Sequence, residues 1–150
     1  MPDIVSPAVR SRLMSGIRGK NTRPELFVRR ALHARGFRYR LHSSSLPGKP
    51  DLVFPARRAV IFVHGCFWHG HDCSLFRLPS TRPDFWQEKI GSNRKRDHRV
   101  KKELAALGWR ELDVWECALR GRGALDPDAL LGRIENWIRE SAGSAEIRGA

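Results

Sequence analysis

Apolar residues recur along this chain with two different periods, and each period predicts one type of element. Apolar positions at helical spacing, bounded by capping and stop residues, predict helices over residues 6–18, 22–35, 81–107 and 127–140. Alternating or continuous apolar runs predict strands over residues 37–41, 51–54, 59–63 and 109–117. The small and polar residues from 141 to 150 predict a frayed tail.

The order of these elements predicts the architecture. Two helices precede three strands, and a helix, a strand and a helix follow, which is typical of a mixed sheet flanked by helices in a three-layer α/β arrangement. Thr22 and Glu25 predict a capping box at the second helix, and Thr81 predicts a capped start for the third. With 150 residues, no internal repeat and no linker, residues 1–150 are expected to form one domain.

The net charge of the chain indicates the kind of partner that it binds. The chain has 28 Lys and Arg residues against 16 Asp and Glu residues, which gives a net charge of +12. Nucleic acid is the commonest polyanion that such a surface binds, and the helix over 81–107 is strongly basic; the alternative is a basic surface without a specific partner. The N-terminus does not resemble a signal peptide and no apolar run approaches about 20 residues, so the cytosol is the expected location.

Histidine and cysteine gather in residues 64–73, directly after the strand over 59–63. The chain has three cysteines, an odd number for a reducing compartment, which favours free thiols or metal ligands over disulfides. A structural zinc site needs four ligands and thiolates bind zinc best, so the cysteines are assigned first and the histidine nearest to one of them completes the set: Cys66, His71, Cys73 and Cys117. The alternative is that Cys66 and Cys117 are inert buried thiols.

The assignment leaves His64 and His69 free for chemistry. Asp51 begins the strand over 51–54 and His64 follows the next strand, so a carboxylate and an imidazole are expected near each other. A carboxylate in that position suits Mg²⁺, and a neutral histidine accepts a proton from water near pH 7. The alternative for Asp51, a turn carboxylate after Pro50, fits the pattern equally well.

Two large aromatic residues, Phe67 and Trp68, lie among the predicted ligands. Loop aromatics are more often core residues, but in a DNA-binding protein rigid apolar side chains can wedge between base pairs at a kink or mismatch. Trp86, on the first turn of the basic helix, allows the same two interpretations.

Four segments of the chain closely resemble the bacterial very short patch repair endonuclease family: LPGKPDLVF, AVIFVHGCFWHGHDC, TRPDFWQEKIGSNRKRD and GWRELDVWECALRG. The N-terminal RSRLMSGIRGKNTRPE is similar as well, so the resemblance covers roughly residues 10–137. It implies a restriction-endonuclease-like core that nicks one strand of duplex DNA 5′ to the thymine of a T·G mismatch. Such mismatches arise when 5-methylcytosine is deaminated, and the nick initiates very short patch repair.

The resemblance also implies roles for single residues. Asp51 is expected to bind Mg²⁺ together with the backbone carbonyl of Val63. His69 is expected to be the general base, and Glu25 and His64 to hold metal-bound waters or the scissile phosphate. The zinc ligands implied are the same four residues as above. DNA contacts are implied for a wedge, for a helix within residues 1–20 and for the basic helix: Phe67, Trp68, Trp86, Met14, Lys89 and Asn93.

The chain departs from the expected pattern at a few positions. Phe62, Val63 and His64 stand where many restriction-type nucleases have an acidic-x-Lys triplet. Val63 replaces a familiar Thr, so a metal contact there is expected through the backbone carbonyl. Gly70 and Asp72 interrupt a run that would be expected to be richer in histidine, but neither is an assigned ligand.

Partners enter through the resemblance, and two other functions remain open. Duplex DNA with a T·G mismatch is the expected substrate, the mismatch-repair protein MutL and a cognate cytosine methyltransferase are the implied partners, and a nucleoid-associated monomer is expected. The first alternative is a restriction-type nuclease that cuts both strands of a matched site. The second is a zinc-stapled DNA-binding module without catalysis.

Overall fold

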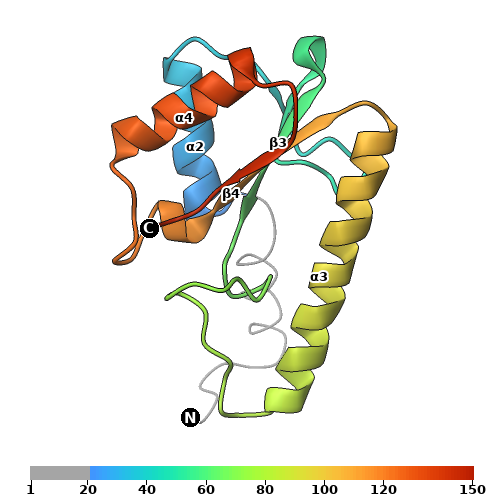
Figure 1. Ribbon diagram of the computed structural model, residues 1–150, viewed down its shortest axis with the longest axis vertical. Helices are drawn as coiled ribbons and strands as arrows, with labels where there is room; N and C mark the ends of the chain where they lie inside the picture. Colours follow the sequence, from blue (N-terminus) through green and yellow to red (C-terminus); the bar gives the residue numbers. More distant parts are fainter. Residues whose placement is uncertain (1–20) are drawn as a thin grey trace.

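Residues 21–150 are described by the structure, a computed structural model with a five-stranded mixed sheet between layers of helices (Figure 1). The helix predicted over residues 6–18, which contains Met14, lies outside the described residues. The strands, in spatial order, are β1 (Arg40–Leu41), β2 (Leu52–Phe54), β3 (Ala59–His64), β4 (Arg110–Trp115) and β5 (Ala145–Ile147). The helices of this part of the chain are α2 (Arg23–Ala34), α3 (Pro83–Ala106) and α4 (Pro127–Glu140), with short 3₁₀ turns η1 (Pro55–Arg57) and η2 (Glu116–Ala118). None of the helices described is long and apolar enough to cross a membrane.

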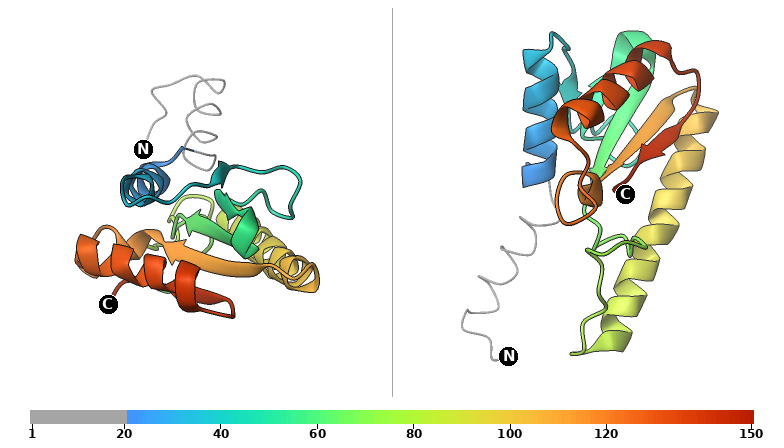
Figure 2. Two further views of the ribbon diagram at one scale, coloured as in Figure 1. Left: turned by 90° about the horizontal axis from the view of Figure 1, so that it is seen from above. Right: turned by 60° about the vertical axis from the view of Figure 1, so that its left-hand side comes forward.

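Two crossover connections produce the layers. β1, β2 and β3 form antiparallel pairs, whereas β4 is parallel to β3 and β5 is parallel to β4. A parallel pair needs a crossover; α3 makes the first on one face of the sheet and α4 makes the second on the other (Figure 2). α2 packs beside α4, so these two helices cover one face and α3 covers the opposite one. The predicted combination of a mixed sheet with flanking helices is therefore confirmed.

Alternation along the strands divides the core into two parts. Leu52 and Phe54 of β2 belong to the cluster that includes α2 and α4, whereas Val53 belongs to a second cluster with side chains of α3. β3 alternates in the same way, with Ile61 in the first cluster and Val60 in the second. Both faces of the sheet are covered, and this explains why β2 and residues 59–63 of β3 are continuous apolar runs.

α2 begins and ends where the sequence predicts. Thr22 is the N-cap, and its hydroxyl accepts a hydrogen bond from the Glu25 amide at 3.4 Å. The Oε1 of Glu25 accepts the amide of Asn21 at 2.9 Å, one residue before the position expected for a capping box. The helix ends at Ala34, and Gly36 follows with a φ of +95°, a left-handed conformation that glycine adopts without strain.

The start of α3 differs from the prediction. Its N-cap is Arg82, with a φ of +55° and no side-chain capping hydrogen bond, so the predicted Thr81 cap is wrong. Pro83 occupies the first turn and has no N–H group to satisfy, which lowers the need for a capping side chain. Thr81 therefore precedes a left-handed turn rather than the helix itself.

The C-terminal residues also differ from the prediction. Ala145–Ile147 form β5 beside β4, so the frayed tail predicted for residues 141–150 is wrong for this stretch. Ile147 is buried in the core, and Arg148 forms an ion pair with Asp72 at 2.7 Å. A strand of three residues is too short to show an alternation of apolar and polar residues. Pairing with β4, rather than the local sequence, therefore determines that this stretch is a strand.

Candidate functional site

The predicted site residues converge at one edge of the sheet. β3 and β4 are parallel, so their carboxyl ends, at His64 and Trp115, lie at the same edge. β2 runs antiparallel to β3 and therefore begins at that edge, with Asp51 just before its first residue. The η2 turn directly after β4 brings Cys117 to the same place. The topology thus gathers residues that are far apart in the sequence.

Asp51 is held against the end of β3. Its Oδ2 accepts the backbone amide of Val63 at 2.7 Å. Carboxylate oxygens of Asp51 and Glu25 and a ring nitrogen of His42 lie within 4.8 Å of one another. Burial raises the pKa of Asp51 to about 7, and the charge of Glu25 adds to this, whereas the Val63 hydrogen bond opposes it. Two carboxyl groups close together and poorly hydrated form a place where a divalent cation is stabilising.

Glu25 projects from α2 and is almost fully buried beside Asp51. Its Oε2 lies 2.6 Å from the Nε2 of His42 and accepts a hydrogen bond from Arg29 at 2.9 Å. His42 was not among the predicted residues. It follows β1, and its amide donates to the Asp51 carbonyl at 3.2 Å, so only the pairing of β1 with β2 places it here.

His64 is fixed by a carboxylate on the neighbouring strand. Its Nε2 lies 2.8 Å from Oδ1 of Asp113 on β4, and its ring centroid is 4.4 Å from that of His69. Burial lowers the pKa of His64, but the hydrogen bond and the charge of Asp113 outweigh burial, and the pKa is raised overall. Asp113 was not predicted as a site residue, because the facing of β4 was not evident from its sequence.

His69 is paired with a carboxylate from α3. Its Nδ1 is hydrogen-bonded to Oδ2 of Asp97. An ionised carboxylate only accepts, so the proton lies on Nδ1 and Nε2 is left as an acceptor. Burial lowers the pKa of His69, although Asp97 acts in the opposite direction, and the ring is therefore neutral near pH 7. Asp97 was also missed, since in the sequence it is one acid within a basic helix.

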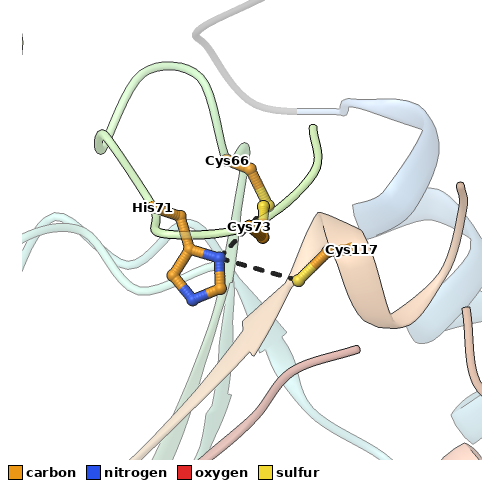
Figure 3. A group of neighbouring side chains, drawn as sticks. All are labelled: Cys66, His71, Cys73 and Cys117. Atoms are coloured by element: carbon orange, nitrogen blue, oxygen red, sulfur yellow. Dashed lines mark hydrogen bonds between the residues drawn. The ribbon is translucent and has the colours of Figure 1, made fainter. Parts of the chain in front are cut away.

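The four residues predicted as zinc ligands come together (Figure 3). One ligand atom from each residue lies within 4.8 Å of the others, and Nδ1 of His71 is 3.7 Å from the sulfur of Cys66 and 3.6 Å from that of Cys117. Three of the residues are buried and Cys73 is partly buried. Burial raises the pKa of the Cys66 thiol. The donors are thus arranged as a compact pocket that can hold one metal ion.

The aromatic residues predicted to form a wedge make one cluster. Phe67 contacts Trp68 and Trp86 with ring centroids 5.0 and 5.4 Å apart, and the two tryptophans are 5.8 Å apart. All three line a groove of about 1020 Å³ that also reaches Val63 and His69. Trp68 is 9% exposed, whereas Phe67 and Trp86 are partly exposed. An aromatic wall therefore leads to the residues around Asp51.

The two residues predicted to contact DNA from the basic helix differ in exposure. Lys89 is partly exposed on α3, whereas Asn93 is 6% exposed, and its amide nitrogen donates to the carbonyl of Trp68 at 2.9 Å. Asn93 therefore fixes the aromatic loop in this structure, and its DNA contact stays a prediction. Met14 lies outside the described residues.

The chain is similar in sequence to known proteins. Residues 2–75 match the family model described as DNA mismatch endonuclease Vsr. The chain is 56% identical over 126 residues to the type II nicking enzyme V.XorIIP of Xanthomonas oryzae, which covers 84% of this chain and 93% of that relative. It is 48% identical over 147 residues to the DNA mismatch endonuclease Vsr of Escherichia coli, covering 98% and 94% of the two chains. It is 43% identical over 122 residues to the type II nicking enzyme V.NmeAIP of Neisseria meningitidis, covering 81% and 87%. The chain belongs to the DNA mismatch endonuclease Vsr family.

Proposed function

We propose that this chain nicks one strand of duplex DNA 5′ to the thymine of a T·G mismatch and so initiates very short patch repair. Its relatives are named as a mismatch endonuclease and as nicking enzymes. The observation that carries the proposal is the convergence of Asp51, His64 and His69 at one sheet edge, beside an aromatic groove. This edge would combine a cation-binding site, a general base and a surface that contacts DNA.

The fold supports the same proposal. We assign the core to the restriction-endonuclease-like class, in which a helix, three strands, a helix and a strand follow one another. α2, the three antiparallel strands, α3 and β4 have this order. The family membership of the chain supports the assignment independently of the order.

Asp51 and the backbone carbonyl of Val63 would hold the catalytic Mg²⁺. In a strand, the N–H and C=O groups of one residue point to the same side, and the Val63 N–H points to Asp51. The Val63 carbonyl would then lie on the side of the carboxylate, and a metal contact through it would not depend on the side chain at position 63. Glu25 supplies a second carboxylate within 4.8 Å. When bound, Mg²⁺ neutralises charge that develops on the phosphoryl oxygens.

His69 would accept the proton of the attacking water. Asp97 holds the ring through Nδ1 and leaves Nε2 as the acceptor, and the lowered pKa of His69 keeps the ring neutral. The water oxygen bonds to phosphorus as the bond from phosphorus to the bridging ester oxygen breaks. That oxygen leaves as a hydroxyl group after taking a proton from solvent, and the proton taken by Nε2 returns to solvent. His64, which is oriented by Asp113, would hold a metal-bound water or the scissile phosphate.

The cluster of Cys66, His71, Cys73 and Cys117 would hold a structural Zn²⁺. Three thiols and one imidazole are a preferred donor set for zinc, and they fill all four tetrahedral positions, so no position remains for a reacting water. The site joins the loop after β3 to the turn after β4. It would thereby fix the loop that carries His69 and the aromatic residues.

Mismatch selectivity would come from the aromatic cluster. Unstacking a T·G pair costs less energy than unstacking a matched pair. A rigid side chain can therefore be inserted at a mismatched step at a lower cost than at a matched step. Phe67 and Trp86 are partly exposed and can approach a base step directly, with Trp68 packed behind them. Each stacked aromatic contributes about 1–3 kcal/mol.

The test is a nicking assay on paired duplexes. Two duplexes identical except for T·G or T·A at one position, with randomised flanking bases and a different fluorophore on each strand, are incubated with and without Mg²⁺. We expect one cut, in the thymine strand of the T·G duplex, and only with Mg²⁺. Equal cutting of both duplexes would favour a restriction-type nuclease, and binding without any cut would favour a non-catalytic module.

A further inference from the structure

Two buried carboxyl groups occupy successive positions on one face of β4. Leu112 and Val114 belong to the core cluster on the side of α2 and α4, so Glu111 and Asp113 face α3. Glu111 is 4% exposed and Asp113 is 6% exposed. Burying two acids on one strand face is unfavourable unless protons, partners or a cation compensate their charge.

The partners that the structure provides compensate only one of the two acids. Oδ1 of Asp113 is 2.8 Å from Nε2 of His64, and Oδ2 is 3.5 Å from the ammonium of Lys101 on α3. Oε1 of Glu111 is buried and has no hydrogen-bond partner within residues 21–150. Both acids and His64 line a hollow of about 450 Å³. The site therefore contains an oxygen ligand that nothing in the described chain uses.

We propose that His64, Glu111 and Asp113 form a binding site for a divalent transition-metal ion such as Mn²⁺. One ring nitrogen and one oxygen from each carboxylate lie within 4.8 Å of one another, a spacing that one ion can bridge. An imidazole with two carboxylates suits Mn²⁺ better than Mg²⁺, which prefers oxygen ligands and retains its water. The hollow leaves room for water in the remaining coordination positions.

Lys101 is a competitor for the same carboxylate. Its ammonium is 3.5 Å from Asp113, but its side chain is 47% exposed, so it can move into solvent when an ion binds. Removing this positive charge should therefore strengthen metal binding. Lys102 is a matched control, because it is exposed on the same helix and does not line the hollow.

The experiment measures Mn²⁺ binding without DNA, so its outcome is independent of nicking. Zinc-loaded protein carrying Asp51→Asn, which removes the other candidate divalent site, is titrated with Mn²⁺ and the free ion is counted by electron paramagnetic resonance. We expect one site in this background, weakened at least tenfold by adding Glu111→Gln. Lys101→Met should tighten binding about threefold, while Lys102→Met should leave it unchanged.

Two results would overturn the site. Equal Mn²⁺ binding with and without Glu111→Gln would show that Glu111 is not a ligand, provided circular dichroism shows that the double variant is folded. If that variant does not fold, Lys101→Met decides: binding that is unchanged or weaker than in the Lys102→Met control contradicts the proposal.

Discussion

Two regions lie at the same edge of the sheet but differ in composition. The Cys/His cluster consists of Cys66, His71, Cys73 and Cys117, and the Asp51 centre consists of Asp51 with Glu25, His42, His64 and His69. The cluster combines three sulfur donors with a single imidazole, and three of its four residues are buried. The Asp51 centre combines carboxylates with imidazoles and adjoins a groove through Val63 and His69. Soft donors in a closed pocket suit a structural ion, whereas hard donors beside open space suit hydrolysis.

The two regions also differ in what holds them. The residues directly after β5 hold the cluster in place. The amide of Gly149 donates to the sulfur of Cys117 at 3.3 Å, and Arg148 forms an ion pair with Asp72 at 2.7 Å. The Asp51 centre is held by side chains from α2 and α3, through Glu25 and Asp97. A change in the first region should therefore act on stability, and a change in the second should act on rate.

The largest effect is expected from Asp51→Asn. Losing the carboxylate that holds Mg²⁺ removes several kcal/mol of transition-state stabilisation, so nicking of a T·G duplex should fall by about 10³-fold or more. DNA binding, measured by fluorescence anisotropy, should change only a few-fold. Asp128→Asn, an exposed acid on α4, serves as the control and should keep the wild-type rate. A rate within tenfold of wild type would contradict the assignment of Asp51.

Cys117→Ser should act on the other region. Serine is a poor zinc ligand, so zinc content, measured by mass spectrometry, should fall together with stability. A loss of about 3–4 kcal/mol would lower the Tm by about 10 °C in a chain of this size. Ser74→Ala, an exposed neighbour of Cys73, is the control. Full zinc occupancy in the Cys117 variant would show that the ligand set is wrong.

Asp97→Asn should slow the reaction without loosening the zinc cluster. The amide of asparagine can donate to Nδ1 of His69 and so favour the tautomer that lacks a free acceptor at Nε2. We expect the single-turnover rate to fall about 10- to 100-fold. Asp84→Asn, in the first turn of the same helix, is the matched control. A rate within twofold of wild type would show that Asp97 does not position His69 for the reaction.

A further effect, on stability rather than on rate, is a pH dependence caused by Asp51. Its pKa is raised from 3.8 to about 7 in the folded protein, so its contribution to stability is fully present below pH 3.8 and is lost as the pH rises to about 7. Without Mg²⁺, Asp51→Asn should therefore gain stability relative to wild type between pH 4 and pH 7, by at most about 1.4 kcal/mol per pH unit. Urea denaturation at several pH values measures this difference, and a difference independent of pH would contradict it.

Local patterns were sufficient for much of the fold. β2 and β3 are apolar runs between turn residues, and α2 has Thr22 at its start and Gly36 after its end. The prediction of a Thr81 cap was wrong because a capping residue acts only when the next residue enters the helix, and Arg82 has a left-handed backbone conformation instead. β5 was missed because its order comes from pairing with β4 and not from its own three residues.

The sequence by itself determined the kinds of donor that the chain offers: three cysteines, a histidine-rich segment, and an acid at the start of a buried strand. Composition and spacing are local properties, so they can be assessed without coordinates. Only the tertiary structure decided which donors meet. His42, Asp97 and Asp113 reach the site through strand pairing and helix packing across long sequence separations, and the sequence carries no local signal of such contacts.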